Sequence, residues 1–234
     1  MKKAIVLLSG GLDSATTLYI ALEKGYRCFC LIIDYGQRHK KEVIQAEKIA
    51  RRAGCASKVL RLSFPWAGSS LLDKNRRLPS GKGLAGRGEK IPSTYVPARN
   101  TIFISLAAAW AETVGAETVF IGANAVDFSG YPDCRPAYFK EFNRLLEAGT
   151  KAGAEGRPVK VETPLIDKKK SEIVGIGRRL KVPYELTWSC YEGGKRPCLR
   201  CDSCVLRKKG FEEAGLKDPL SERCYEREYE YAKR

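Results

Sequence analysis

The chain has 234 residues, a formal net charge of +15 and nine cysteines. This length is sufficient for one large α/β domain whose core needs no disulfides. No apolar run approaches the roughly 20 residues that a membrane span requires, and the N-terminal apolar run, residues 4–8, is short for a signal peptide. We therefore expect a cytoplasmic protein without a membrane partner.

The positive charge favours a polyanionic partner, which could be a nucleic acid or a phosphorylated small molecule. Charge alone does not choose between the two. Lysine and arginine are spread over the whole length, with short runs such as residues 168–170 and 208–209. We interpret most of these side chains as solvated surface.

The first elements alternate between strand and helix. Residues 4–8 form an apolar run that ends in glycines, which is typical of a strand buried on both faces. A helix over residues 15–24, a strand over 28–35, a helix over 43–53 and a strand over 58–64 follow. Gly25 and Gly54 provide the expected helix stops.

The alternation continues with a helix over residues 101–114, a strand over 117–122, a helix over 137–148 and a strand over 159–165. This order predicts an α/β fold with a doubly wound parallel sheet. Residues 65–97 interrupt it and have the composition of a lid or a disordered loop. The strand pattern ends near Tyr184, so we divide the chain into an α/β domain, 1–183, and a small C-terminal region, 184–234.

A glycine-rich loop, Ser9-Gly10-Gly11-Leu12-Asp13-Ser14, follows the first strand. Its glycines allow a phosphate to approach the backbone, and the following helix contributes the positive end of its dipole. The alternative is a tight turn in which Asp13 only caps the helix. The loop matches neither a Walker A motif nor a dinucleotide fingerprint.

Instead, the loop resembles the pyrophosphate loop of N-type ATP pyrophosphatases. The resemblance implies a Rossmann-like fold of the adenine nucleotide α-hydrolase type, with ATP as co-substrate and transfer of AMP to an oxygen of the substrate. We expect Asp13 to help organise Mg²⁺ on the phosphates. The expected nucleotide-binding residues are Leu8, Ser9, Gly10, Gly11, Leu12, Asp13, Ser14, Ala15, Thr16, Thr17, Leu18 and Arg38.

Four of the cysteines, Cys190, Cys198, Cys201 and Cys204, lie within a short segment. Four thiolates complete a tetrahedral zinc site and leave no open position for catalysis, so we predict a structural zinc ion and a C-terminal zinc-binding region. The two-residue gaps resemble knuckles whose backbone N–H groups point at sulfur. An iron–sulfur cluster is the alternative metal centre, and disulfides are disfavoured in the expected compartment.

Further motifs strengthen a specific resemblance. Residues 34–39 read DYGQRH, residues 96–100 read VPARN, residues 127–135 read DFSGYPDCR and residues 163–165 read TPL. With the glycine loop and the four cysteines, they resemble the 7-cyano-7-deazaguanine synthase family over nearly the whole chain. One departure is Ala125-Val126, where many members of that family carry Glu-Thr.

The resemblance implies that 7-carboxy-7-deazaguanine, ammonia and ATP are converted to the nitrile through an adenylated acid and an adenylated amide. It also suggests a homodimer. The residues expected to be catalytic are Asp13, Ser14, Arg99, Asp127 and Asp133. The residues expected to bind the substrate are Asp127, Ser129, Gly130, Tyr131, Asp133 and Arg135.

Other functions stay open at this point. An ATP pyrophosphatase that modifies tRNA directly would use the positive charge for RNA binding. A synthase of this type could instead act on another carboxylate or on a protein terminus. A zinc-dependent nucleic-acid-binding module is disfavoured, because the chain has no recognised nucleic-acid-binding motif, and we do not expect a nucleic acid partner. Cys134 is a candidate for a covalent intermediate only if its thiol has a lowered pKa.

Overall fold

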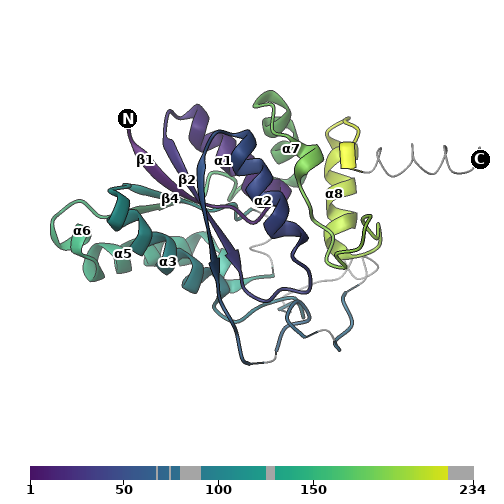
Figure 1. Cartoon of the computed structure of the whole chain (residues 1–234), viewed down its shortest axis with the longest axis horizontal. Helices are drawn as coiled ribbons and strands as arrows, with labels where there is room; N and C mark the ends of the chain where they lie inside the picture. The colour runs from purple at the N-terminus through teal and green to yellow at the C-terminus, as the bar shows by residue number, and fades with distance from the viewer. Residues whose placement is uncertain (67, 74, 80–90, 125–129, 221–234) are drawn as a thin grey trace, which may run out of the picture.

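The computed structural model describes residues 1–66, 68–73, 75–79, 91–124 and 130–220. Five parallel strands form one sheet in the order β3-β2-β1-β4-β5 (Figure 1). The strands are β1 (Lys3–Leu7), β2 (Arg27–Asp34), β3 (Ala56–Arg61), β4 (Thr118–Phe120) and β5 (Lys160–Glu162).

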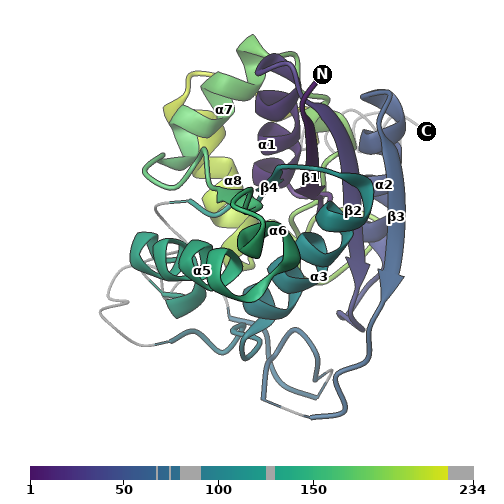
Figure 2. The same ribbon diagram turned by 90° about the vertical axis from the view of Figure 1, so that its left-hand side faces the viewer.

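Helices cover both faces of this sheet (Figure 2). They are α1 (Leu12–Glu23), α2 (Lys41–Arg52), α3 (Arg99–Val114), α5 (Pro136–Gly149), α6 (Lys151–Ala154), α7 (Lys170–Arg179) and α8 (Asp202–Glu213), with short 3-10 turns η2 (Pro132–Cys134) and η3 (Tyr184–Leu186). The predicted doubly wound parallel sheet is confirmed.

The strands divide the core into two layers, because successive side chains of a strand point to opposite faces. In β1, Val6 packs in a cluster with Leu18 of α1 and Ile49 of α2. Its neighbour Ile5 packs with Ile104 of α3 in the other cluster. A strand buried on both faces has no polar position to offer, which explains the continuous apolar run in the sequence.

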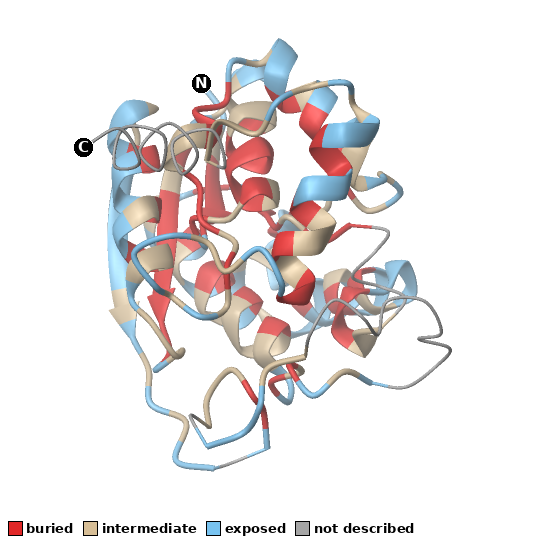
Figure 3. Cartoon of the chain, turned by 90° about the vertical axis from the view of Figure 1, so that its right-hand side faces the viewer, coloured by how far each residue is buried: buried red, intermediate tan, exposed pale blue. Residues whose placement is uncertain are grey.

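The edge strand β3 is the exception. Five of its six residues are exposed and only Leu60 is half-buried. Figure 3 shows the strand as a largely exposed edge. The structure ends β3 at Arg61, whereas the predicted strand continued to Phe64. Leu62 N still donates to Asp34 O at 2.8 Å, so the pairing with β2 extends one residue further.

Besides the short helix α6, two longer helices were not predicted, α7 and α8. They pack against each other, and α7 also packs on α1 (Figure 1). Tyr184 and Phe211, from the proposed C-terminal region, lie in the same apolar cluster as Leu18 and Val174. The division at 183/184 stays a prediction.

The 65–97 segment lies partly outside the described residues, which omit 67, 74 and 80–90. In its described parts the chain forms no helix or strand. Ser70 N donates to Ser93 O at 2.8 Å, so the two ends of the segment lie side by side. A lid or disorder stays a prediction. No helix in the described part of the chain has both the length and the apolar character to cross a bilayer.

Gly10 joins the glycine loop to α2 through a close backbone contact. Its φ is 85°, a left-handed conformation that side chains disfavour. A Cβ built at this position would lie 2.2 Å from Glu42 O and 2.9 Å from Ala46 N. Position 10 therefore requires glycine for two reasons, the left-handed backbone conformation and the lack of space for a Cβ atom.

We expect Gly10→Ala to destabilise the fold by more than the matched control Gly25→Ala. Gly25 has a similar φ of 80° but nothing within 4 Å of its added Cβ, so it reports only the conformational cost of about 1–2 kcal/mol. The free energy of unfolding measured in urea should fall at least twice as far for Gly10→Ala. Equal losses for the two variants would contradict the close contact.

Candidate active site

The serines of the glycine loop hold it in shape. Ser9 N donates to Ser14 Oγ at 3.1 Å, and Ser14 Oγ donates to Gly11 O at 3.2 Å. The N-cap of α1 is Gly11, and no side chain caps the helix. The N-cap residue therefore leaves the first-turn N–H groups without a side-chain acceptor, which is the arrangement that binds phosphates at helix N-termini.

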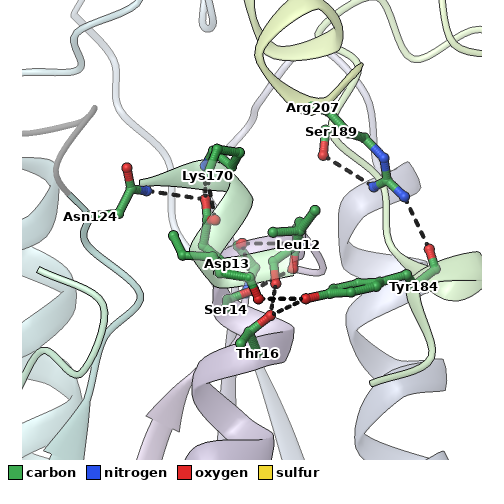
Figure 4. Close-up of polar contacts among 12 residues, drawn as sticks. Leu12, Asp13, Ser14, Thr16, Asn124, Lys170, Tyr184, Ser189 and Arg207 are labelled. Atoms are coloured by element: carbon green, nitrogen blue, oxygen red, sulfur yellow. Dashed lines mark hydrogen bonds and ion pairs between the residues drawn. The ribbon is translucent and has the colours of Figure 1, made fainter. Parts of the chain in front are cut away.

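Asp13 lies beside this helix terminus and is held by two partners (Figure 4). Lys170 Nζ, at the start of α7, lies 2.7 Å and 2.9 Å from its two carboxylate oxygens. Asn124 Nδ2 donates to Asp13 Oδ2 at 3.3 Å. The Lys170 side chain is 14% exposed, so it is an exception to the expectation that most of the basic side chains are solvated surface. The Mg²⁺ role of Asp13 stays a prediction.

A cavity of about 290 Å³ opens beside the loop. Its apolar part is lined by Ile33, near the carboxyl end of β2, and by Ile121, just after β4. Asp13 and Lys170 line its polar part. The strand order reverses between β1 and β4, and ligands of open α/β sheets bind at such a point. The volume is near the lower end for a small-molecule site.

Arginines from two sides reach this cavity. Arg99, the first residue of α3, donates to the Tyr35 hydroxyl at 3.4 Å. Burial raises the pKa of Tyr35, so its hydroxyl stays protonated beside the guanidinium. Arg38 also lines the cavity and donates to Asp73 O at 3.0 Å. Both arginines were expected at the site, and the structure brings them to the same cavity as the glycine loop.

The predicted substrate-binding motif is described only in part, because Asp127 and Ser129 lie outside the described residues. Tyr131 lines the cavity, and its hydroxyl is 2.6 Å from Thr94 Oγ1. Gly130 packs against Pro92, which an added Cβ would approach to 3.3 Å. Arg135 is exposed and does not line the cavity.

Asp133 has a partner at the start of α3. It is 7% exposed, and its Oδ2 accepts from Asn100 N at 3.1 Å. Asn100 Nδ2 in turn donates to Cys134 Sγ at 3.2 Å. Asp133 itself does not line the cavity, whereas Asn100 and Cys134 do. The contact gives Asp133 a role in holding α3, and its catalytic role stays a prediction.

The later residues of the predicted nucleotide-binding run lie inside the protein. Ala15, Thr16, Thr17 and Leu18 are all 0% exposed, and Ala15 and Leu18 belong to the core. Leu8, Ser9, Gly11, Leu12 and Ser14 line the cavity. Thr16 Oγ1 donates to Leu12 O at 2.9 Å and contacts the Tyr184 hydroxyl at 2.9 Å.

The four clustered cysteines converge as their spacing predicted. The sulfurs of Cys190, Cys198, Cys201 and Cys204 all lie within 4.8 Å of one another, a donor set that could hold one metal ion. Cys198 N donates to Cys190 Sγ and Cys201 N donates to Cys198 Sγ, both at 3.3 Å. These bonds are the knuckle contacts expected from the sequence, and they favour thiolate sulfur.

The cysteine segment is attached to the glycine loop. Trp188 N donates to Gly10 O at 2.9 Å, and Trp188 Nε1 donates to Cys190 O at 2.9 Å. Lys41 Nζ lies 3.5 Å from the centre of the Trp188 ring and also donates to Gly194 O at 2.7 Å. The segment is thereby fixed between the loop and the start of α2.

A second attachment runs through Arg207 of α8 (Figure 4). Its guanidinium pairs with both carboxylate oxygens of Asp218, at 2.7 Å and 2.8 Å, and donates to Thr187 Oγ1 at 2.7 Å and Tyr184 O at 3.2 Å. The Arg207 side chain is 5% exposed. Removing one partner of such a buried pair is strongly destabilising, because the other charge stays buried.

Sequence reasoning missed Lys170, Arg207, Trp188 and Asn124 as members of the site. A lysine within a basic run gives no sign that it is buried, and the sequence separation of 157 residues between Lys170 and Asp13 hides their contact. The cavity residues that the sequence analysis had selected, such as Arg38, Arg99 and Tyr131, all lay within its motifs.

We expect Lys170→Ala to weaken Mg·ATP binding by about tenfold or more, equal to about 1.4 kcal/mol. Its loss removes a cation beside the phosphate-binding loop and leaves the Asp13 carboxylate uncompensated. Titration calorimetry with Mg·ATP measures the effect. Lys168→Ala is the control, since Lys168 precedes α7 and forms a half-exposed pair with Glu172 of that helix. Unchanged or tighter ATP binding to Lys170→Ala would contradict this interpretation.

Comparison with solved structures finds two chains of low sequence identity, each with a TM-score below 0.5. The NMN synthetase from Francisella tularensis is 15% identical, with a TM-score of 0.49 over 95% of this chain and 81% of that one. An NH3-dependent NAD synthetase from Campylobacter jejuni is also 15% identical, with a TM-score of 0.44 over 79% of this chain and 66% of that one.

Sequence relatives are much closer. The 7-cyano-7-deazaguanine synthase of Anaeromyxobacter sp. (strain Fw109-5) is 50% identical over 221 residues, which cover 93% of this chain and 95% of the relative. The protein of the same name from Thermosynechococcus vestitus is 51% identical and covers 94% and 95%. A model of the family described as queuosine biosynthesis protein QueC matches residues 3–215. The chain therefore belongs to the QueC family.

Proposed function

We propose that this chain is a 7-cyano-7-deazaguanine synthase, which converts 7-carboxy-7-deazaguanine, ammonia and ATP to the nitrile. The observation that carries the proposal is one cavity that joins an uncapped helix N-terminus to Arg99 and Arg38. The helix terminus suits the phosphates of ATP, and a guanidinium suits a carboxylate. Family membership adds the substrate, because the relatives carry that enzyme name.

The residues of the site would divide the work as follows. The backbone of the glycine loop and Lys170 hold the β- and γ-phosphates, so that negative charge on the leaving pyrophosphate is stabilised as it develops. Arg99 orients the substrate carboxylate toward the α-phosphorus. The carboxylate oxygen attacks phosphorus, the bond to pyrophosphate breaks, and an acyl adenylate forms.

Two further steps complete the conversion. Ammonia attacks the acyl carbon and AMP leaves, which gives the amide. The amide oxygen is then adenylated by a second ATP, and loss of AMP with the remaining N–H protons gives the nitrile. Each activation uses the same phosphate-binding loop, so one site serves both.

The metal groups have separate roles in this proposal. Cys190, Cys198, Cys201 and Cys204 would hold a zinc ion, whose contribution is folding free energy, because four thiolates close its coordination. Asp13 would approach Mg²⁺ on the phosphates after Lys170 shifts toward the nucleotide. A homodimer and a cytoplasmic location belong to the same proposal and rest on the family resemblance and the sequence.

The function is tested directly with purified protein, Mg·ATP, ammonium and 7-carboxy-7-deazaguanine. We expect mass spectrometry to show the nitrile, with two AMP and two pyrophosphate released for each nitrile. An absence of nitrile together with turnover of another acid would contradict the substrate. Salt-dependent micromolar tRNA binding with AMP transfer to RNA would instead support direct tRNA modification.

The metal proposal predicts that Cys201→Ser loses zinc and melts at a lower temperature. A midpoint decrease of roughly 5 °C or more is expected, given about 2–4 °C per kcal/mol for a chain of this size. Elemental analysis and calorimetry measure both effects. Cys55→Ser is the matched control, because Cys55 is half-buried and lies outside the cluster. Unchanged zinc content in Cys201→Ser would exclude Cys201 as a ligand.

A further inference from the structure

The proposed reaction brings three charged reactants together, two anions and one cation, which need groups of opposite charge in the cavity wall. ATP and the substrate carboxylate are anions, and Arg38, Arg99 and Lys170 in the cavity wall suit both. Ammonia in neutral water is present mainly as the ammonium cation. A cation requires an oxygen acceptor, and the cavity wall contains two carboxylates, Asp13 and Glu42.

The two carboxylates are not equivalent. Asp13 is held by Lys170 at 2.7 Å and by Asn124. Glu42 accepts no hydrogen bond and forms no ion pair from any residue in the described part of the chain, and its principal charged neighbour is Arg99. Its carboxylate therefore keeps its acceptor capacity for a ligand in the cavity.

The position of Glu42 is fixed by the fold. It lies in the first turn of α2, and its own carbonyl oxygen is the atom against which Gly10 packs. The residue that carries the carboxylate is thus in backbone contact with the phosphate-binding loop. On the other side, Arg99 at the start of α3 lies within electrostatic range. A group bound to Glu42 would therefore lie in the cavity that the phosphate-binding loop and Arg99 also line.

Burial sets the proton affinity of this carboxylate. It raises the pKa of Glu42 to about 7, although the Arg99 charge opposes the shift and the negative charge of the Cys190 thiolate adds to it. A base whose pKa lies near the working pH transfers protons efficiently in both directions. A cation beside the carboxylate would also offset the cost of keeping it charged inside the protein.

We propose that Glu42 forms the ammonium site of this enzyme and accepts the proton that turns ammonium into the attacking ammonia. The inference rests on the proposed function, since it places the third reactant in the same cavity. Ammonium donates hydrogen bonds to the Glu42 carboxylate, and one of its protons transfers to a carboxylate oxygen.

The freed lone pair on nitrogen then attacks the acyl carbon of the adenylate, which Arg99 orients. A C–N bond forms, and the bond between that carbon and the phosphate oxygen breaks, so the electron pair leaves with AMP. AMP carries away the second proton from nitrogen. Glu42 is half-buried, so its own proton can return to solvent before the next cycle.

The test separates adenylation from capture in Glu42→Gln. We expect ATP–pyrophosphate exchange that depends on 7-carboxy-7-deazaguanine to stay within about twofold of wild type, because the phosphate site is intact. Amide and nitrile formation from ammonium should fall by roughly 10²-fold or more, the usual contribution of a general base. Glu42→Asp should recover part of the rate, and Glu47→Gln, on an exposed part of α2, should match wild type.

Hydroxylamine sharpens this test, because it is largely unprotonated at neutral pH and needs no base before it attacks. Glu42→Gln should form the hydroxamate at nearly the wild-type rate while it fails to use ammonium. Equal loss with both nucleophiles would overturn the inference and indicate a structural role, and so would unimpaired use of ammonium. A wild-type protein without carboxylate-dependent exchange would overturn the proposed function as well.

Discussion

The contact between Gly10 and the first turns of α2 is the constraint on which the site depends. Because no side chain fits between Gly10 and Glu42 O, the phosphate-binding loop and α2 have a fixed distance. The Gly10 carbonyl accepts from Trp188 N, so the cysteine segment is attached to the same residue. One glycine thereby aligns the loop, the carboxylate of Glu42 and the segment that carries the metal ligands.

This arrangement gives the proposed closed zinc site a structural role in a catalytic protein. Four thiolates leave no coordination position for a substrate, but they fix Cys190, whose carbonyl accepts from the Trp188 ring. Arg207 adds a buried ion pair on the other side of the segment and bonds to Tyr184 O. The Tyr184 hydroxyl contacts Thr16 of α1. The C-terminal region thus supports α1, whose N-terminus is the proposed phosphate site.

How far the sequence predicts this structure depends on the range of each signal. Buried strands, helix stops and cysteine spacing are local patterns, so the sheet and the metal-ligand set were predictable. Lys170 and Arg207 carry no local mark, because their burial is decided by α7 and α8 packing against distant elements. Asp133 was expected to be catalytic and to bind the substrate, which stays a prediction, and its contact with Asn100 N could only come from the fold.

Charge balance connects these parts into one site. Lys170 pairs with Asp13 at 2.7 Å, and in the proposed function this pair would keep a bare carboxylate away from the phosphates of ATP, while Arg99 would offer its charge to the substrate. If every acidic group in the cavity were paired in this way, the site would repel ammonium as strongly as it attracts anions. Glu42 is held at the loop by the Gly10 contact, and its carboxylate has no hydrogen-bond donor among the described residues. This carboxylate would therefore attract a cation in a cavity whose other charged groups favour anions.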